Sequence, residues 1–149
     1  MADETGASAV EFAVLMPFLV LLVFGIIEFG LLFYNQQVIT NASREGARAA
    51  IKGDCANRVK DDEIIQIVKA YCFDPTDATR SRLITFGAND DPTVSIDPSP
   101  SACTPGAAGE YVEVTVHYTY NYLVPSVIGF GPTKQLEAKT VMKMMEPVP

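Results

Sequence analysis

Two glutamates stand in an otherwise apolar stretch near the N-terminus. The stretch GASAVEFAVLMPFLVLLVFGIIEFGLLFY covers residues 6–34 and contains Glu11 and Glu28. A carboxylate at the centre of a bilayer costs on the order of 3 kcal/mol on insertion scales, so such groups are usually kept for a function. The chemistry open to them is pairing with an opposite charge, protonation, or hydration at the membrane edge.

The apolar stretch predicts a membrane-spanning helix. Residues 12–34 include only one charge, Glu28, and at about 1.5 Å per residue they cross a hydrocarbon layer of roughly 30 Å. A cleaved secretory signal fits less well, because acidic Asp3 and Glu4 precede the stretch where a signal carries a basic residue. We therefore expect a single uncleaved span.

The charges around the span bear on its orientation. Arg44, Arg48 and Lys52 follow it and no basic residue precedes it, so the positive-inside rule alone would leave the C-terminal part in the cytoplasm. Cys55, Cys72 and Cys103 all follow the span. Such cysteines could form one disulfide in an oxidising compartment, with three pairings open, or could be three separate buried thiols.

Other chemistry has little support in the sequence. No C-x-x-C pair accompanies His117, the only histidine, so no metal site is expected. No nucleophile–base set, phosphate loop or cofactor motif is present, and we expect neither an enzyme nor a cofactor. A net charge of −7, with eleven scattered basic residues, argues against nucleic-acid binding. The 149 residues suffice for an anchor and one modest domain.

The helical pattern continues beyond the span to about Lys52, where Gly53 is a plausible stop. Small or apolar residues recur along this extension at helical spacing: Val38, Ala42, Gly46, Ala49 and Gly53. Such a stripe lets a sheet approach closely. Arg44, Glu45 and Arg48 face away from it, either as an ion network between subunits or as a solvated helix face.

Pro17 lies within the predicted span. It removes one amide from the helical hydrogen-bond ladder, so a bend or local melting is expected there. Such a soft point could help a subunit leave the bilayer, or it could be a tolerated kink.

The remainder predicts a second helix and a small sheet. An acidic first turn at Asp61 opens a helix that ends before Phe73-Asp74-Pro75. Strict alternation predicts long strands over residues 111–120 and 135–144, paired antiparallel. Most of residues 74–109 is expected to be loop, but brief apolar pieces at 83–86 and 94–96 could be short strands, the latter as a third strand of the sheet. The expected fold is α+β: a long N-terminal helix, half transmembrane and half amphipathic, packed on a small antiparallel sheet.

Two parts of the sequence resemble a known family. Gly6-Ala7-Ser8-Ala9-Val10-Glu11 looks like the processing site of type IV prepilins, and GASAVEFAVLMPFLVLLVFGIIEFGLLFYNQQVITNASREGARAA resembles the N-terminal signature of the TadE-like pseudopilins of tight-adherence (Flp-type) pili. The closing VEVTVHYTYNYLVPSVIGFGPTKQLEAKTVMKM is similar to that family's terminal hairpin. The resemblance covers roughly the first and last thirds of the chain.

The resemblance implies a pilin-like fold and a structural role. It implies a leader at residues 1–6 cut after Gly6 by a prepilin peptidase, an assembly helix at 7–52, and an α+β domain at 53–149. The helix would be held in the bacterial inner membrane, and the domain would be periplasmic, or extracellular when in a pilus. This orientation is opposite to the one that the positive-inside rule alone would give. Implied partners are other pilin or pseudopilin subunits, in homo- or hetero-oligomers, the inner-membrane assembly platform and membrane lipid.

Within that hypothesis Glu11 pairs with the new α-amine of Ala7 in a neighbouring subunit, which offsets the cost of a lone charge. The alternative is a Glu11 carboxylate hydrated at the membrane edge. For Glu28 no partner is evident: it could be protonated, paired across a helix bundle, or near the outer interface. Two other functions stay open, namely the main repeating subunit of a filament and a membrane-tethered periplasmic binding domain that never polymerises.

Overall fold

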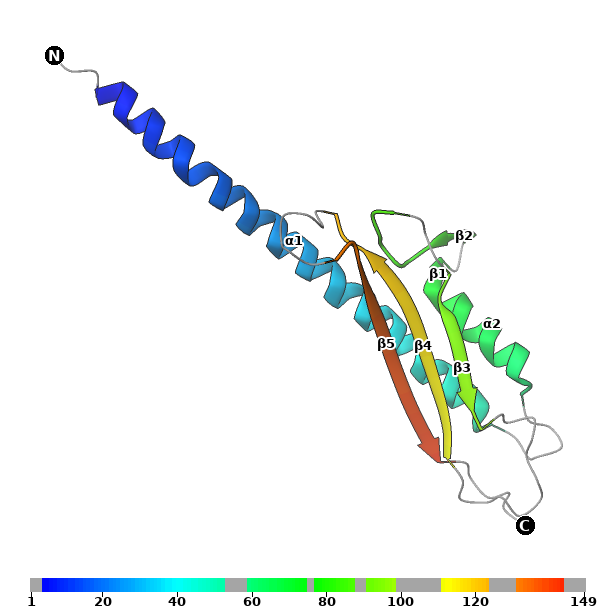
Figure 1. Cartoon of the computed structure of the whole chain (residues 1–149). Helices are drawn as coiled ribbons and strands as arrows, with labels where there is room; N and C mark the ends of the chain where they lie inside the picture. The colour runs from blue at the N-terminus through cyan, green and yellow to red at the C-terminus, as the bar shows by residue number, and fades with distance from the viewer. Residues whose placement is uncertain are drawn as a thin grey trace, which may run out of the picture.

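The computed structural model describes residues 4–52, 59–74, 77–87, 91–98, 111–123 and 131–143. The elements run in the order α1 (Glu4–Ala50), α2 (Asp61–Cys72), β1 (Phe73–Asp74), β2 (Asp77–Ser81), β3 (Thr93–Asp97), β4 (Tyr111–Asn121) and β5 (Thr133–Lys143). Figure 1 shows α1 as a rod whose N-terminal half projects from the molecule. The C-terminal half of α1, together with α2 and the strands, forms what we call the head domain.

The long first helix is confirmed. α1 has 47 residues and ends at Ala50, close to the expected end at Lys52. The helix continues without interruption through Pro17, so the local melting expected there is not seen. A proline removes a single bond of the ladder, and the bonds on either side keep the chain helical. Within the described residues, α1 is the one helix long and apolar enough to cross a membrane.

The three-stranded sheet is confirmed as antiparallel, with β4 in the centre of the order β3-β4-β5. Val94 on β3 lies opposite Val116 on β4, and Val114 lies opposite Thr140 on β5. The prediction of a short strand at residues 83–86 is wrong. The short strand in this part of the chain is β2, at Asp77–Ser81, and it pairs with β1. Beyond it, the backbone of Ile84 bonds to a side chain of α1 instead of joining a sheet.

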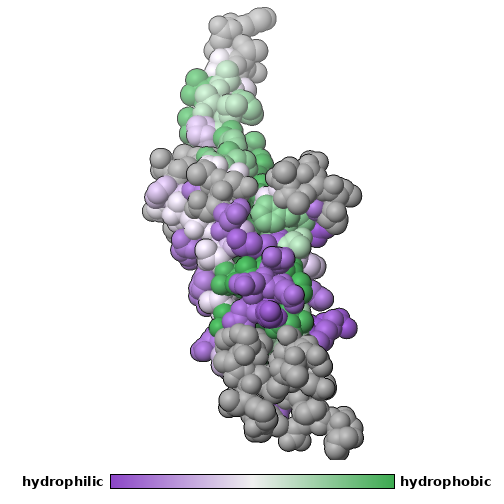
Figure 2. Space-filling model, turned by 90° about the vertical axis from the view of Figure 1, so that its right-hand side faces the viewer, coloured by the Kyte–Doolittle hydropathy of each residue, from purple (hydrophilic) through white to green (hydrophobic). Residues whose placement is uncertain are grey.

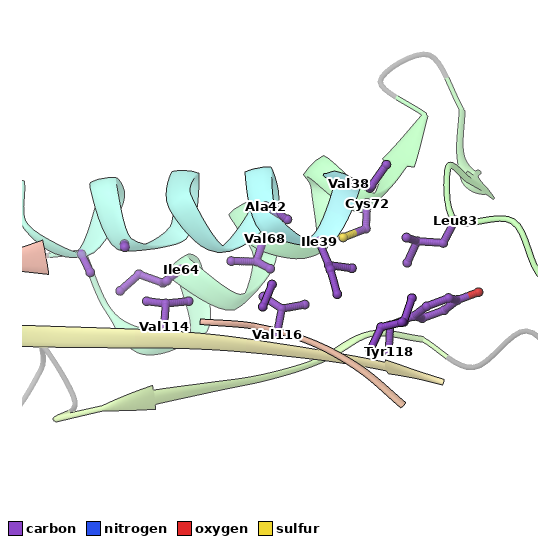
Figure 3. Packing of buried hydrophobic residues seen from close by; sticks show 14 of the residues in the cluster. Val38, Ile39, Ala42, Ile64, Val68, Cys72, Leu83, Val114, Val116 and Tyr118 are labelled. Atoms are coloured by element: carbon purple, nitrogen blue, oxygen red, sulfur yellow. The ribbon is translucent and has the colours of Figure 1, made fainter. Parts of the chain in front are cut away.

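The core lies between one face of the sheet and the two helices. Alternate residues of β4 are buried on that face: Val112, Val114, Val116, Tyr118 and Tyr120. Figure 3 shows Val114 and Val116 pointing from β4 toward Ile64 and Val68 of α2 and toward Ile39 and Ala42 of α1. α2 ends at Cys72, where predicted, and Phe73 takes an extended conformation and begins β1.

The small-residue stripe of α1 faces this core. Four of its predicted members are buried: Val38, Ala42, Gly46 and Ala49. Gly53 lies outside the described residues. The closest approach is at Gly46, where an added Cβ would lie 2.5 Å from Cγ2 of Val68 and 3.2 Å from Cγ1 of Val114. Neither valine can move its methyl groups freely, so a side chain at this position would push α2 and β4 away from the helix.

Replacing Gly46 with leucine is therefore expected to destabilise the head domain by about 1–3 kcal/mol through overpacking. The matched control is Gly30→Leu on the same helix, where an added Cβ meets nothing within 4 Å. Leucine is the better helix former, so G30L should keep or raise the melting temperature. Thermal unfolding of the full chain in detergent checks both. Equal melting temperatures for the two variants would contradict the close packing.

Candidate functional site

Glu28 is held by the end of β4. It belongs to the apolar half of α1, where most side chains are exposed, but Glu28 itself is only 2 % exposed. The Tyr120 hydroxyl donates to Oε1 at 2.5 Å, and the Leu123 amide donates to both carboxylate oxygens at 3.1 and 3.2 Å. The sequence left the partner of Glu28 open, and the structure supplies it from the same chain, 92 and 95 residues away.

Tyr120 is suited to this bond. It is fully buried, and its ring meets that of Tyr122 edge to face, with centroids 5.5 Å apart. Burial, followed by the hydrogen bond to Glu28 and the charge of Glu28, raises the pKa of the Tyr120 phenol well above its ordinary value of 10.0. The phenol thus keeps its proton and remains a donor to the carboxylate at any physiological pH.

Asn35 forms a second attachment two turns further along α1. Its side-chain nitrogen donates to the Ile84 carbonyl at 2.7 Å, and its side-chain oxygen accepts from the Ile84 amide at 2.9 Å. The side-chain amide therefore satisfies both backbone groups of one residue, as a neighbouring strand would. Since seven residues separate Glu28 from Asn35, both lie on the same face of the helix.

Two further polar groups of α1 bond to β5. Nε2 of Gln36 donates to the Glu137 carbonyl at 2.8 Å, and the hydroxyls of Ser43 and Thr140 are 2.8 Å apart. With Glu28 and Asn35 these contacts fix the helix lengthwise against the sheet. Sequence reasoning missed both Asn35 and Tyr120. For Asn35 a signal was present, because it lies seven residues after Glu28 on an otherwise apolar helix face.

An open pocket of about 310 Å³ lies beside Glu28. It is lined by Glu28, Phe29, Leu32, Tyr122, Gly131, Thr133 and Lys134. The lining is mostly apolar, with the carboxylate of Glu28 turned to its own hydrogen bonds and an exposed Lys134 among the lining residues. It lies where the projecting half of α1 leaves the head domain.

The structure does not bring the predicted assembly residues together. Gly6, Ala7, Glu11 and Pro17 lie on the exposed, projecting half of α1. The second group lies at the far end of the same helix: Arg44 and Arg48 are exposed and Glu45 is half-buried. The 33 residues of helix between Glu11 and Arg44 span about 50 Å. Any pairing of Glu11 with the other group within one chain is therefore excluded by distance.

One of the three cysteines, Cys72, lies among the described residues. Cys72 is a free, buried thiol, and burial raises its pKa to about 11 from 9.0, partly offset by the charge of Arg82. Cys55 and Cys103 lie outside the described residues. Among the residues that the structure does describe, no three His, Cys, Asp or Glu side chains are grouped as metal ligands.

Most of the first helix matches a protein-family model. Residues 6–48 match the family model described as TadE-like protein. No curated protein and no solved structure gives a significant match to the chain. The matched segment contains Glu11, Glu28, Asn35 and the first three members of the small-residue stripe, Val38, Ala42 and Gly46, and it ends two residues before α1 does.

The bond between Tyr120 and Glu28 should contribute measurably to stability. Tyr120→Phe removes the hydroxyl and leaves a buried carboxylate with the Leu123 amide alone, so a loss of about 1.5–3 kcal/mol is expected. Tyr111→Phe is the control, because Tyr111 is 60 % exposed at the other end of β4. Denaturant unfolding of the full chain in detergent compares them, and an unaffected Y120F would contradict the contact.

The same variant should change the dependence of stability on alkaline pH. Because the folded pKa of Tyr120 is raised, its contribution is complete below pH 10.0 and is lost as the pH rises above that value, by about 1.4 kcal/mol per unit. The stability gap between wild type and Y120F should therefore narrow above pH 10.0. Cys72 adds a similar loss in both proteins and cancels in the difference. A constant gap up to pH 12 would count against the shift.

Proposed function

We propose, from the match of residues 6–48 to the TadE-like family model, that this chain is a pilin-like protein associated with tight-adherence pili and that it serves as a minor pilin or pseudopilin. It is a structural subunit with no catalytic role, held in the bacterial inner membrane by α1 with its head domain in the periplasm. From there it is assembled, through its helix, with other pilin or pseudopilin subunits by the inner-membrane platform.

The observation that carries the proposal is the exposed apolar half of α1. Its large side chains are largely free of contacts in the folded chain, with Phe18 as much as 69 % exposed. Figure 2 shows green side chains along this projecting part, whereas the head domain shows more purple. A water-soluble monomer rarely exposes such a surface, so lipid or neighbouring helices must cover it. A subunit that moves from the bilayer to a filament needs both coverings in turn.

Glu11 is proposed to set the register of assembly. It lies on the exposed part of α1, and no described residue of the head domain is bonded to it, unlike Glu28. After cleavage behind Gly6 by a prepilin peptidase, the new amine of Ala7 in a neighbouring subunit would neutralise it. Arg44, Glu45 and Arg48 would then form ion pairs between head domains at the other end of the helix.

Intact-mass analysis of chain recovered from membranes and from sheared surface material tests this function. We expect a chain lacking Met1 to Gly6 in the sheared material, and a drop of at least tenfold in that fraction for Glu11→Ala. Glu63→Ala, at an exposed position in the first turn of α2, is the control and should assemble normally.

Other outcomes separate the alternatives. A full-length chain found only in membranes, with E11A behaving as wild type, would mean a permanently tethered domain that does not polymerise. Purified fibres composed mostly of this chain would mean a major subunit in place of a minor one. Normal assembly of E11A would remove the pairing role of Glu11 while leaving the pilin role standing.

A further inference from the structure

The attachment of Glu28 to the head domain limits how much of α1 lipid can surround. The sheet reaches the helix at Glu28, where Tyr120 and Leu123 bond to it. Residues 6–27, the part of the apolar stretch that lies before that point, extend roughly 33 Å at about 1.5 Å per residue. This length matches the hydrocarbon layer of about 30 Å. The last part of the apolar stretch, residues 29–34, then lies beside the head domain and outside the hydrocarbon.

The end of the head domain at this level carries exposed apolar side chains. Phe86 and Leu123 are 43 % and 36 % exposed. Both are tied to this end of the molecule: Leu123 bonds to Glu28, and the Phe86 amide bonds to the carbonyl of Asn121 at the end of β4. We call Phe86 and Leu123 the apolar rim.

We propose that the apolar rim rests in the interfacial layer of the phospholipid bilayer, so that the head domain is seated on the membrane and does not stand away from it. The inference rests on the proposed membrane insertion of α1. Continuity with the bilayer favours lipid as the occupant, because the helix enters the bilayer at the end of the domain that bears the rim. The interfacial layers are only about 5–8 Å deep on each side, which suits a few large side chains.

Two further features of this end suit a phospholipid surface. The pocket beside Glu28 is largely apolar and opens at the level of the rim, with Phe29 and Leu32 from α1 among its lining residues. Lys134 also lines it and is exposed, so its ammonium group is available to a lipid phosphate. An apolar pocket with a cation among its lining residues matches the change from acyl chain to headgroup across the interface.

The seating has a consequence for Glu11. With the outer boundary of the hydrocarbon at Glu28, the 17 residues down to Glu11 span about 25 Å. Glu11 then lies inside the hydrocarbon layer, near its opposite face, and not in the headgroups. A carboxylate at that depth gains far more from a counter-charge than one in water.

Single-tryptophan reporters test the seating directly, since the chain contains no tryptophan. Phe86→Trp and Leu123→Trp place reporters on the rim. Val141→Trp is the control: it is exposed and opposite Glu113, eight residues and about 27 Å along β4 from Asn121. Phe18→Trp reports on the span itself. The full-length variants are reconstituted in phosphatidylcholine vesicles containing lipid brominated near the headgroup end of its chains, and circular dichroism checks that each is folded.

We expect bromolipid to quench F86W and L123W at least twofold and to leave V141W unchanged, with F18W quenched best by lipid brominated near the chain ends. If F18W is quenched while F86W and L123W are not, the head domain stands clear of the membrane and the inference is wrong, although the anchor is real. If F18W is also unquenched, the proposed membrane insertion fails. Rim reporters that bromolipid does not reach but that are shielded from aqueous acrylamide would overturn the seating in favour of a second copy covering the rim.

Discussion

The buried carboxylate of Glu28 and its two donors determine how the helix and the head domain are joined. A charge in an apolar helix must find partners or remain in water, and here the Tyr120 hydroxyl and the Leu123 amide provide them. Because both donors lie at the end of β4, the bond sets where along α1 the sheet begins. The residues before Glu28 are left exposed and those after it are progressively covered. A polar contact thus divides one continuous helix into two parts with different surroundings.

The packing beyond this contact follows from the same register. Asn35 lies seven residues after Glu28 and Ala42 seven after Asn35, so the face that begins with the carboxylate continues into the small-residue stripe. At Gly46 that stripe meets α2 and β4 at once, which only a residue without a Cβ allows. The polar contacts fix the position of the helix lengthwise, while the small residues fix its distance from the sheet.

Periodicity in the sequence predicted α1, α2, β4 and β5, because each alternates or repeats over enough residues to reveal its buried face, whereas β3 was indicated only by a brief apolar piece at residues 94–96. The strand expected at residues 83–86 failed for a long-range reason. The backbone groups of Ile84 are satisfied by Asn35, 49 residues away, and no local pattern contains that information. The partner of Glu28 was hidden in the same way, since its hydroxyl donor lies 92 residues along the chain. A local sequence pattern predicts which face of an element is buried, but it does not predict which polar groups form hydrogen bonds with one another.

The two glutamates of the apolar stretch therefore differ in kind. Transfer of a helix from lipid to a bundle of like helices changes apolar contacts little, since lipid chains are as apolar as leucine. Polar groups must then determine the direction of such a transfer. Glu28 cannot do so, because its bonds are internal to the chain and are the same before and after. Glu11 is exposed and is not bonded to any head-domain residue that the structure describes, so its surroundings can change with assembly. In the proposed subunit the internal pair keeps the head domain fixed on its helix, and the outer glutamate is the group whose electrostatic energy differs between membrane and filament.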